Sequence, residues 1–203
     1  MNRRDEIMAS IQESLPRLDR PPPQMARFDD SPPPPLLGAF TDNLQRMGGV
    51  LLRSPLAGDP LLPVRDRIAG AKVICSVVPE ITGTLDITGV IAPRALADVD
   101  FAIVRASFAV AETGSVLLSD ADLYVDALAY LAKHLIVLLD PTDIVLDLRR
   151  ARRRPDFHER RHPIFHTGPS ATVDIEGSMI DGAHGVRSLA VLPVARTGNN
   201  LRQ

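Results

Sequence analysis

The chain of 203 residues contains one cysteine, no tryptophan and only 4% aromatic residues. The single cysteine, Cys75, excludes an intrachain disulfide and cannot alone hold a thiolate-ligated iron–sulfur cluster. It lies in the apolar run 72–78, for which we expect a buried strand and a packing role for the thiol. With so few aromatic residues, the core must be built from leucine, valine, isoleucine and alanine. A content of 45% hydrophobic residues is enough for a sizeable core.

Several function classes have no support in this sequence. No apolar run approaches the ~18 residues that span a bilayer, and the charged first turns contain no hydrophobic signal segment. The net charge of −2 argues against a general affinity for nucleic acid or membrane surfaces. Neither a G-x-G-x-x-G nor a G-x-x-x-x-G-K-[ST] motif is present, so a dinucleotide or Walker-type site is unsupported. We therefore expect a soluble, cytoplasmic protein with no membrane span.

The N-terminal 35 residues differ from the remainder in composition. Residues 3–15 carry apolar side chains at helical spacing, namely Ile7, Met8, Ile11 and Leu15. Residues 16–35 are rich in proline and predict an extended linker. Because a short amphipathic helix cannot bury its apolar face alone, we expect it to dock on the body or on a partner subunit. The sequence thus predicts an arm, 1–35, and an α/β domain, 36–203.

The body alternates between predicted helices and strands. A helix that contains Phe40 and Leu44 is expected to end at Gly48-Gly49. The other predicted helices are 64–69, 123–131 and 144–153, and the predicted strands are 50–52, 72–78, 101–104, 108–111, 116–118, 135–139, 164–167 and 189–194. Strands 101–104 and 108–111 are interpreted as a possible bent or hairpin pair. This alternation predicts a mixed, largely parallel sheet covered by helices.

The segment 168–177, GPSATVDIEG, is the most informative stretch of the chain. It reads as a tight turn after strand 164–167, followed by a short acidic helix. Ser170 and Thr172 are both good N-cap residues, and we expect Thr172 to cap the helix while Ser170 contacts a ligand. The exposed N–H groups of such a helix favour a carboxylate or phosphate. An ordinary capped helix without a ligand is the alternative.

A second segment, Ala111-Glu112-Thr113-Gly114-Ser115, follows an apolar run. Glu112 is therefore expected at a strand end, where open α/β sheets bind ligands. Its carboxylate could orient a ligand, cap backbone amides or act as a nucleophile. We expect one anion-preferring cleft, lined by the 112–114 loop and the 168–172 turn.

Together these segments resemble the LUD-domain family, specifically its lactate-utilisation protein C (LutC/YkgG) branch. The matching residues are 111–115, 133–137, 168–176 and 182–189. Two positions depart from the family pattern: Ala171 stands in place of an arginine, and Val186 in place of a proline. The resemblance implies a three-layer αβα fold of the NagB/RpiA/CoA-transferase-like type.

The resemblance also directs the choice of site residues. The expected ligand-binding residues are Glu112, Thr113, Gly114, Gly168, Ser170, Thr172, Asp174 and His184. Glu112 and His184 are the only candidates for catalysis, and a structural role is the alternative for each. Three histidines, 158, 162 and 166, are spaced four apart, but Pro163 breaks any helix that could align them, so we expect no metal site.

Two functions compete at this point. The resemblance implies a subunit that serves the oxidation of L-lactate to pyruvate, with iron–sulfur clusters held by partner subunits and no cofactor bound by this chain alone. Its own part would be to bind a small carboxylate or phosphate, or to assemble the complex, and it could also pair with a second copy of itself. The alternative is a stand-alone CoA-transferase-like or sugar-phosphate enzyme that uses Glu112. The arginine-rich stretch 149–161 could face an acidic partner, but it lacks the interleaved aromatic residues of a nucleic-acid site.

Overall fold

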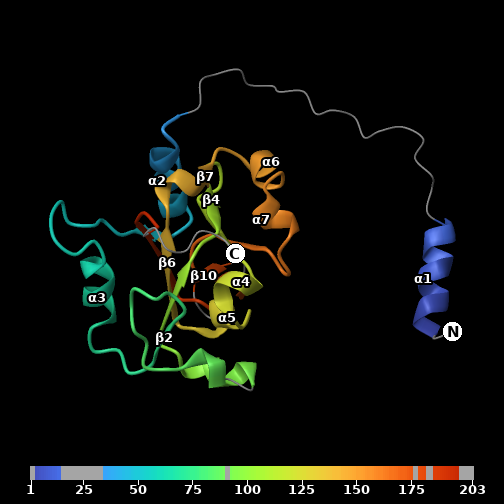
Figure 1. Cartoon of the computed structure of the whole chain (residues 1–203), viewed down its shortest axis with the longest axis horizontal. Helices are drawn as coiled ribbons and strands as arrows, with labels where there is room; N and C mark the ends of the chain where they lie inside the picture. The colour runs from blue at the N-terminus through green and yellow to red at the C-terminus, as the bar shows by residue number, and fades with distance from the viewer. Residues whose placement is uncertain (1–2, 15–33, 90–91, 176–177, 182–184, 197–203) are drawn as a thin grey trace. The chain divides into compact units, whose positions relative to one another are not determined.

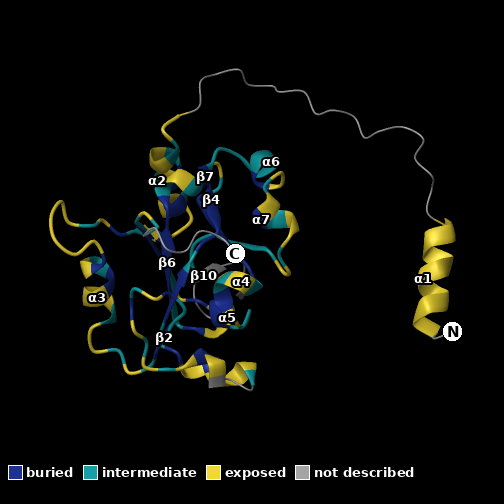
Figure 2. Ribbon diagram, viewed as in Figure 1, coloured by how far each residue is buried: buried dark blue, intermediate teal, exposed yellow. Residues whose placement is uncertain are grey.

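A computed structural model describes residues 3–14, 34–89, 92–175, 178–181 and 185–196. For 173–175 and 178–181 only the backbone is described. The chain divides into two units, Met1–Pro32 and Pro33–Gln203. The first contains helix α1 (Arg3–Ser14), which confirms the helix predicted from residue 3. None of its residues is buried, and its apolar side chains Ile7, Met8 and Ile11 are about half exposed (Figure 2).

Deleting residues 1–35 is expected to leave the body folded. The core clusters of the body are formed by residues from Leu36 onward. The shortened protein should therefore unfold in one cooperative transition at the full-length midpoint, within about 2 °C. Thermal unfolding followed by circular dichroism measures this. Loss of the cooperative transition would show that the body needs the arm.

The second unit, which we call the body, contains short helices and two main sheets (Figure 1). Its helices are α2 (Leu36–Arg46), α3 (Leu62–Ile68), α4 (Asp120–Leu123), α5 (Leu128–Leu131), α6 (Leu148–Ala151) and α7 (Pro155–His158), with 3-10 helices at Ile87–Gly89, Pro93–Asp98 and Pro141–Asp143. Helix α2 ends as predicted, because Gly48 adopts a φ of +81° and the N–H of Gly49 bonds to the carbonyl of Leu44.

The central sheet is parallel throughout its described strands. Its order is β1 (Val50–Leu51), β11 (Ser188–Pro193), β6 (His134–Leu139), β3 (Phe101–Arg105) and β2 (Ile74–Ser76). All pairs are parallel, and β6 lies at the centre between β11 and β3. The continuous apolar run of β6 is typical of a strand that is covered on both faces.

The second sheet is mixed and carries the two sequence motifs. Its order is β7 (Ile144–Val145), β4 (Phe108–Val110), β5 (Ser115–Leu118) and β8 (Ile164–His166). Strands β4 and β5 are antiparallel and β8 is antiparallel to β5, whereas β7 runs parallel to β4. Strand β9 (Ala171–Ile175) and strand β10 (Ser178–Asp181) form a separate antiparallel pair.

Alternating side chains sort the core into layers. In β6, Leu135 and Val137 face one cluster with α2 and α5, whereas Ile136 and Leu138 face another with α3. The first cluster also contains side chains of β4 and β5, so the two sheets share a core. The outer face of the second sheet packs against α6 and α7 around Phe108. The body is thus a three-layer α/β structure with a parallel central sheet, as predicted, and Figure 2 shows its buried strands at the centre.

Four local predictions were wrong. Residues 171–175 form strand β9 and not a helix, because β-branched Thr172, Val173 and Ile175 suit a strand that has a pairing partner in β10. The predicted helix 144–153 begins as strand β7, and α6 starts only after Asp147. The remaining two errors concern segments 101–111 and 123–131.

Segment 123–131 is divided because Tyr124 adopts a φ of +59°, which ends α4 before α5 begins. Strands β3 and β4 do not pair with each other. The chain passes from the central sheet to the second sheet after Arg105, and β4 pairs with β5 and β7.

Candidate functional site

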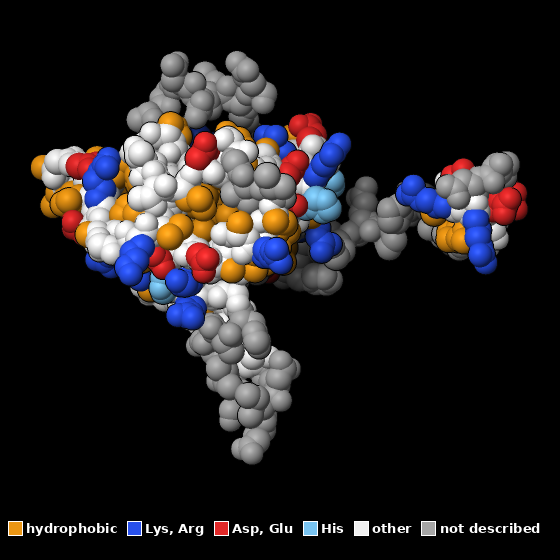
Figure 3. All heavy atoms as spheres, turned by 90° about the horizontal axis from the view of Figure 1, so that it is seen from below, with side chains coloured by type: hydrophobic (Ala, Val, Ile, Leu, Met, Phe, Trp, Pro, Cys, Tyr) orange, Lys and Arg blue, Asp and Glu red, His pale blue; other side chains and the backbone are white. Residues whose placement is uncertain are grey.

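A cleft of about 440 Å³ lies beside the turn that follows β8. One wall is formed by Ala129 and Tyr130 of α5, and another by β8 and residues 167–170. Leu135 of β6, together with Gly185 and Val186, which precede β11, completes the described lining. Figure 3 views the body from below, and hydrophobic and uncharged atoms occupy much of the middle of that face.

The two motif turns both rest against α2. Gly114 is buried and adopts a φ of +66°, and a Cβ added there would overlap the backbone of Leu44. Gly168 has a φ of +68°, and a Cβ there would overlap the carbonyl oxygen of Met47. Glycine is required at both positions for the positive φ and for the close approach. Helix α2 therefore positions both turns.

Hydroxyl groups link the two turns directly. Ser115 Oγ donates to Thr113 Oγ1 over 2.7 Å and also shares a hydrogen bond with Thr167 Oγ1. The side chain of Asn43, on α2, donates to the carbonyl of Ala111 over 2.8 Å. The segments 111–115 and 167–170 thus form one connected unit, although more than 50 residues separate them in the sequence.

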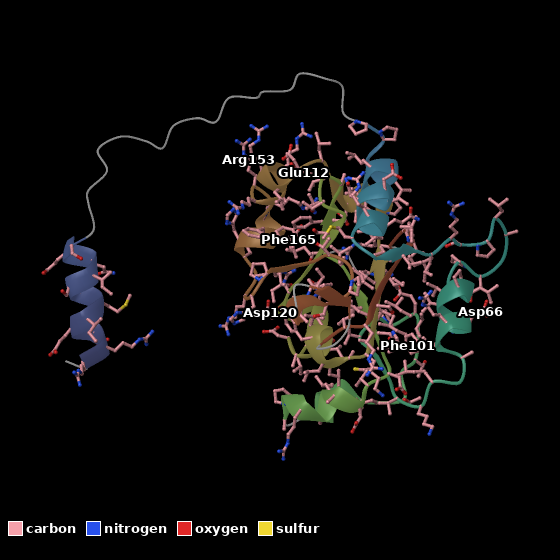
Figure 4. All side chains as sticks on the ribbon, turned by 180° about the vertical axis from the view of Figure 1, so that it is seen from behind. Asp66, Phe101, Glu112, Asp120, Arg153 and Phe165 are labelled. Atoms are coloured by element: carbon pink, nitrogen blue, oxygen red, sulfur yellow. The ribbon has the colours of Figure 1, made fainter. Side chains whose placement is uncertain are left out.

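Glu112 lies outside the described lining of the cleft. Its side chain is exposed, and its Oε2 accepts a hydrogen bond from the backbone N–H of Leu148 over 3.0 Å. Leu148 is the first residue of α6, so the carboxylate faces the positive end of that short helix. In the view of Figure 4, Glu112 and Arg153 lie toward the same end of the body, and Phe165 lies farther from that end. Among the roles considered for Glu112, this contact corresponds to capping a backbone amide.

The other expected site residues are placed as follows. Gly168 and Ser170 border the cleft, and the N–H of Ser170 donates to the carbonyl of Val186 over 2.7 Å. Thr172 lies in β9 opposite Ile180, so it does not cap a helix. The backbone of Asp174 belongs to the same strand. His184 lies outside the described residues.

His166 borders the cleft and was not among the expected ligand-binding residues. Its Nε2 is buried and has no hydrogen-bond partner in the described structure. Burial also lowers the pKa of the imidazole below its ordinary value of 6.5. The ring centre lies 5.4 Å from that of Tyr130. The sequence pattern distinguished His166 only by its spacing from two other histidines. It did not indicate that the Nε2 of His166 is buried.

The cleft is uncharged along its described lining. Its polar side chains are Tyr130, His166, Thr167 and Ser170, and the lowered pKa keeps the imidazole of His166 neutral near pH 7. Within the residues that the structure describes, no group of three histidine, cysteine, aspartate or glutamate side chains is arranged to hold a metal ion. The described helices also include none with the length and apolar character to cross a membrane.

Replacing His166 by phenylalanine is expected to weaken the pH dependence of stability. Because burial lowers the pKa of His166, the unfolded chain binds its proton more tightly than the folded chain. The wild type therefore loses stability as the pH falls through 6.5, and the variant should lose less. Urea unfolding at pH 7.5 and pH 5 measures the difference. His158→Phe, on an exposed part of α7, keeps His166 and should follow the wild type. Equal losses in all three proteins would contradict the prediction.

Comparison with known proteins gave two matches. The family model for the LUD domain matches residues 91–194, a range that includes both motif turns and the described cleft. The body is similar in structure to a DUF162 family protein from Deinococcus radiodurans, with a TM-score of 0.57 and 21% sequence identity. That match covers 79% of this chain and 96% of the other, and it shows a shared fold. No curated protein matched the sequence.

Proposed function

Because the chain belongs to the LUD-domain family, we propose that it is a lactate-utilisation subunit of the protein C type. In this proposal it serves the oxidation of L-lactate to pyruvate in the cytoplasm, together with partner subunits that hold iron–sulfur clusters. The observation that carries the proposal is the joining of the two motif turns. Segments 111–115 and 167–170, which carry the resemblance, are bonded to each other and rest on the same helix.

The properties of Cys75 support the proposal that partner subunits, and not this chain, hold the iron–sulfur clusters. Cys75 is buried in β2, and burial raises the pKa of its thiol to about 11. A thiol of this kind is a poor metal ligand, because ligation requires the thiolate. The electron-carrying clusters therefore belong to partners in the proposal, and this chain assembles the complex or binds a ligand for it.

In this proposal the ligand is a small carboxylate or phosphate, as expected from the turn at 168–172. It would bind at the turn formed by Gly168 and Ser170, where the exposed side chain of Ser170 supplies a hydroxyl donor. Isothermal titration of the full chain with lactate, pyruvate and phosphate tests this part. Ser170→Ala should weaken binding of the preferred anion about tenfold, because a hydrogen bond to a charged group is worth ~1.5–3 kcal/mol.

The stand-alone enzyme remains the second hypothesis, and the position of Glu112 does not favour it. Its carboxylate is bonded to the start of α6 and lies outside the described lining of the cleft. Turnover of an acyl-CoA by the isolated chain, lost in Glu112→Gln, would favour the enzyme over the subunit.

Co-purification from the native host tests the subunit role. We expect proteins that contain iron–sulfur clusters to elute with the chain during size-exclusion chromatography, and the elution volume also reports whether a second copy is present. Gly168→Ala, which disturbs the joined turns, should reduce the recovered partners, whereas Gly58→Ala, in an open loop, should not. Recovery of the chain alone, in a fully folded state, would contradict the proposal.

A further inference from the structure

The size of the cleft differs from what a small anion needs. At about 440 Å³ it falls within the range of about 300–1,000 Å³ that is typical of sites for drug-sized ligands. Lactate, with three carbons and three oxygens, would leave most of this volume unfilled. A single phosphate would do the same. The volume alone therefore indicates a larger occupant.

The lining indicates the chemical character of that occupant. Leu135, Ile164 and Val186 contribute apolar side chains, and Phe165 and Pro169 also border the space. Carboxylates and phosphates usually bind arginine or lysine side chains, but no described lining residue is a lysine or an arginine. An anion that moved past the exposed Ser170 into the apolar part of this cleft would lose its hydration without gaining an opposite charge. The lining thus favours an uncharged molecule with a large apolar surface.

Two aromatic side chains indicate that the occupant is flat. Tyr130 is 42% exposed, so much of its ring is available for contact, and its centre lies 5.4 Å from the imidazole of His166. Aromatic rings contact each other favourably at centre-to-centre distances of about 4.5–7 Å. A planar ring that enters the cleft would find two aromatic partners there.

His166 also indicates that the occupant carries one polar atom. Its buried Nε2 has no hydrogen-bond partner among the described residues. A buried polar group without a partner is costly, and a neutral imidazole nitrogen can bond to a carbonyl or hydroxyl oxygen, according to its tautomer. Because this nitrogen is buried, the imidazole would have to turn toward the cleft before such an oxygen could reach it, and the resulting bond would remove the cost.

We propose that the cleft binds an uncharged aromatic or quinone-type ring that carries a carbonyl or hydroxyl oxygen, with the ring against Tyr130 and the oxygen bonded to His166. This inference concerns the cleft itself and does not rest on the subunit role. It goes beyond the small anion considered above and assigns a binding role to two residues that neither the motifs nor the family match singled out.

The test uses duroquinone, an uncharged ring whose four methyl groups block addition of the Cys75 thiol. The full chain is titrated by calorimetry with duroquinone, lactate and phosphate. We expect duroquinone to bind more tightly than either anion. His166→Phe, which keeps an aromatic ring but removes both nitrogens, should weaken duroquinone binding about tenfold, since one hydrogen bond is worth up to about 1.5 kcal/mol. His158→Phe should leave it unchanged.

A second measurement reports on the cleft without altering it. The chain has two tyrosines and no tryptophan, so in Tyr124→Phe the only tyrosine signal comes from Tyr130. With ¹³C-labelled tyrosine, duroquinone should shift this NMR signal and saturate at the affinity found by calorimetry. This readout remains informative if His166→Phe fails to fold. Binding of the anions in preference to the ring, binding of neither, or an unshifted Tyr130 signal would overturn the proposal.

Discussion

Replacing Gly114 by alanine is expected to lower the free energy of unfolding by about 3 kcal/mol, a sum of backbone strain and overpacking. Gly114 has a φ of +66°, which disfavours any residue with a Cβ. The added Cβ would also lie 2.7 Å from Cα of Leu44 and closer still to its backbone nitrogen. Because these are backbone atoms, no side-chain rotation can relieve the overlap. Helix α2 must move, which strains the bond between Asn43 and Ala111.

Gly70→Ala is the matched control for this variant. Gly70 has a φ of +82°, but a Cβ there would meet no atom within 4 Å. Gly70→Ala should therefore lower the free energy of unfolding only by the cost of backbone strain, about 1 kcal/mol. Urea unfolding of both variants separates the two effects. Equal losses would mean that the contact between the Gly114 turn and α2 contributes nothing.

Replacing Asp122 by alanine is expected to cost about 2–4 kcal/mol, the loss that follows when buried donors keep no acceptor. Asp122 Oδ2 accepts from the N–H of Ser119 over 2.9 Å and from its hydroxyl over 2.7 Å. The hydroxyl of Ser107 donates to both carboxylate oxygens of Asp122. Ser107 and Ser119 are buried, so water cannot readily replace the carboxylate. The variant should melt earlier and lose the start of α4.

The pH dependence gives a second readout for Asp122. Burial raises the pKa of this carboxyl above 3.8, even though its hydrogen bonds act in the opposite direction. Its contribution to stability is therefore fully present below 3.8 and decreases as the pH rises through the folded pKa. The difference between wild type and Asp122→Ala should thus be larger at pH 4 than at pH 7. Asp66→Ala, on the exposed side of α3, should change stability by less than about 0.5 kcal/mol at either pH. A loss for Asp122→Ala as small as this would contradict the prediction.

Prediction from sequence succeeded where the local pattern and the tertiary environment agree. The end of α2 follows from Gly48-Gly49, since glycine readily adopts the conformation that ends a helix. Strand β6 follows from an apolar run that suits a position covered on both faces. The LUD-domain family was likewise recognised from the motif residues, and the family match agrees.

The segment after Gly168 shows how a local pattern can mislead. Ser170, Thr172 and Asp174 have the spacing of a helix start, but the same stretch contains β-branched residues that suit a strand. The choice depends on the partner strand β10 and on the bond from Ser170 to Val186, which lie later in the chain. No local propensity encodes the availability of such partners.

The sequence by itself determined the N-terminal helix, the parallel core strands and the two motifs. Only the tertiary structure decided how the motif residues are used. In the folded chain, Glu112 is bonded to the start of α6 and the Gly114 turn contacts α2. His166 lies half-buried beside Tyr130, with its Nε2 buried. The physical reason is that a side chain's role depends on its burial and its partners, and these are supplied by segments far away in the sequence.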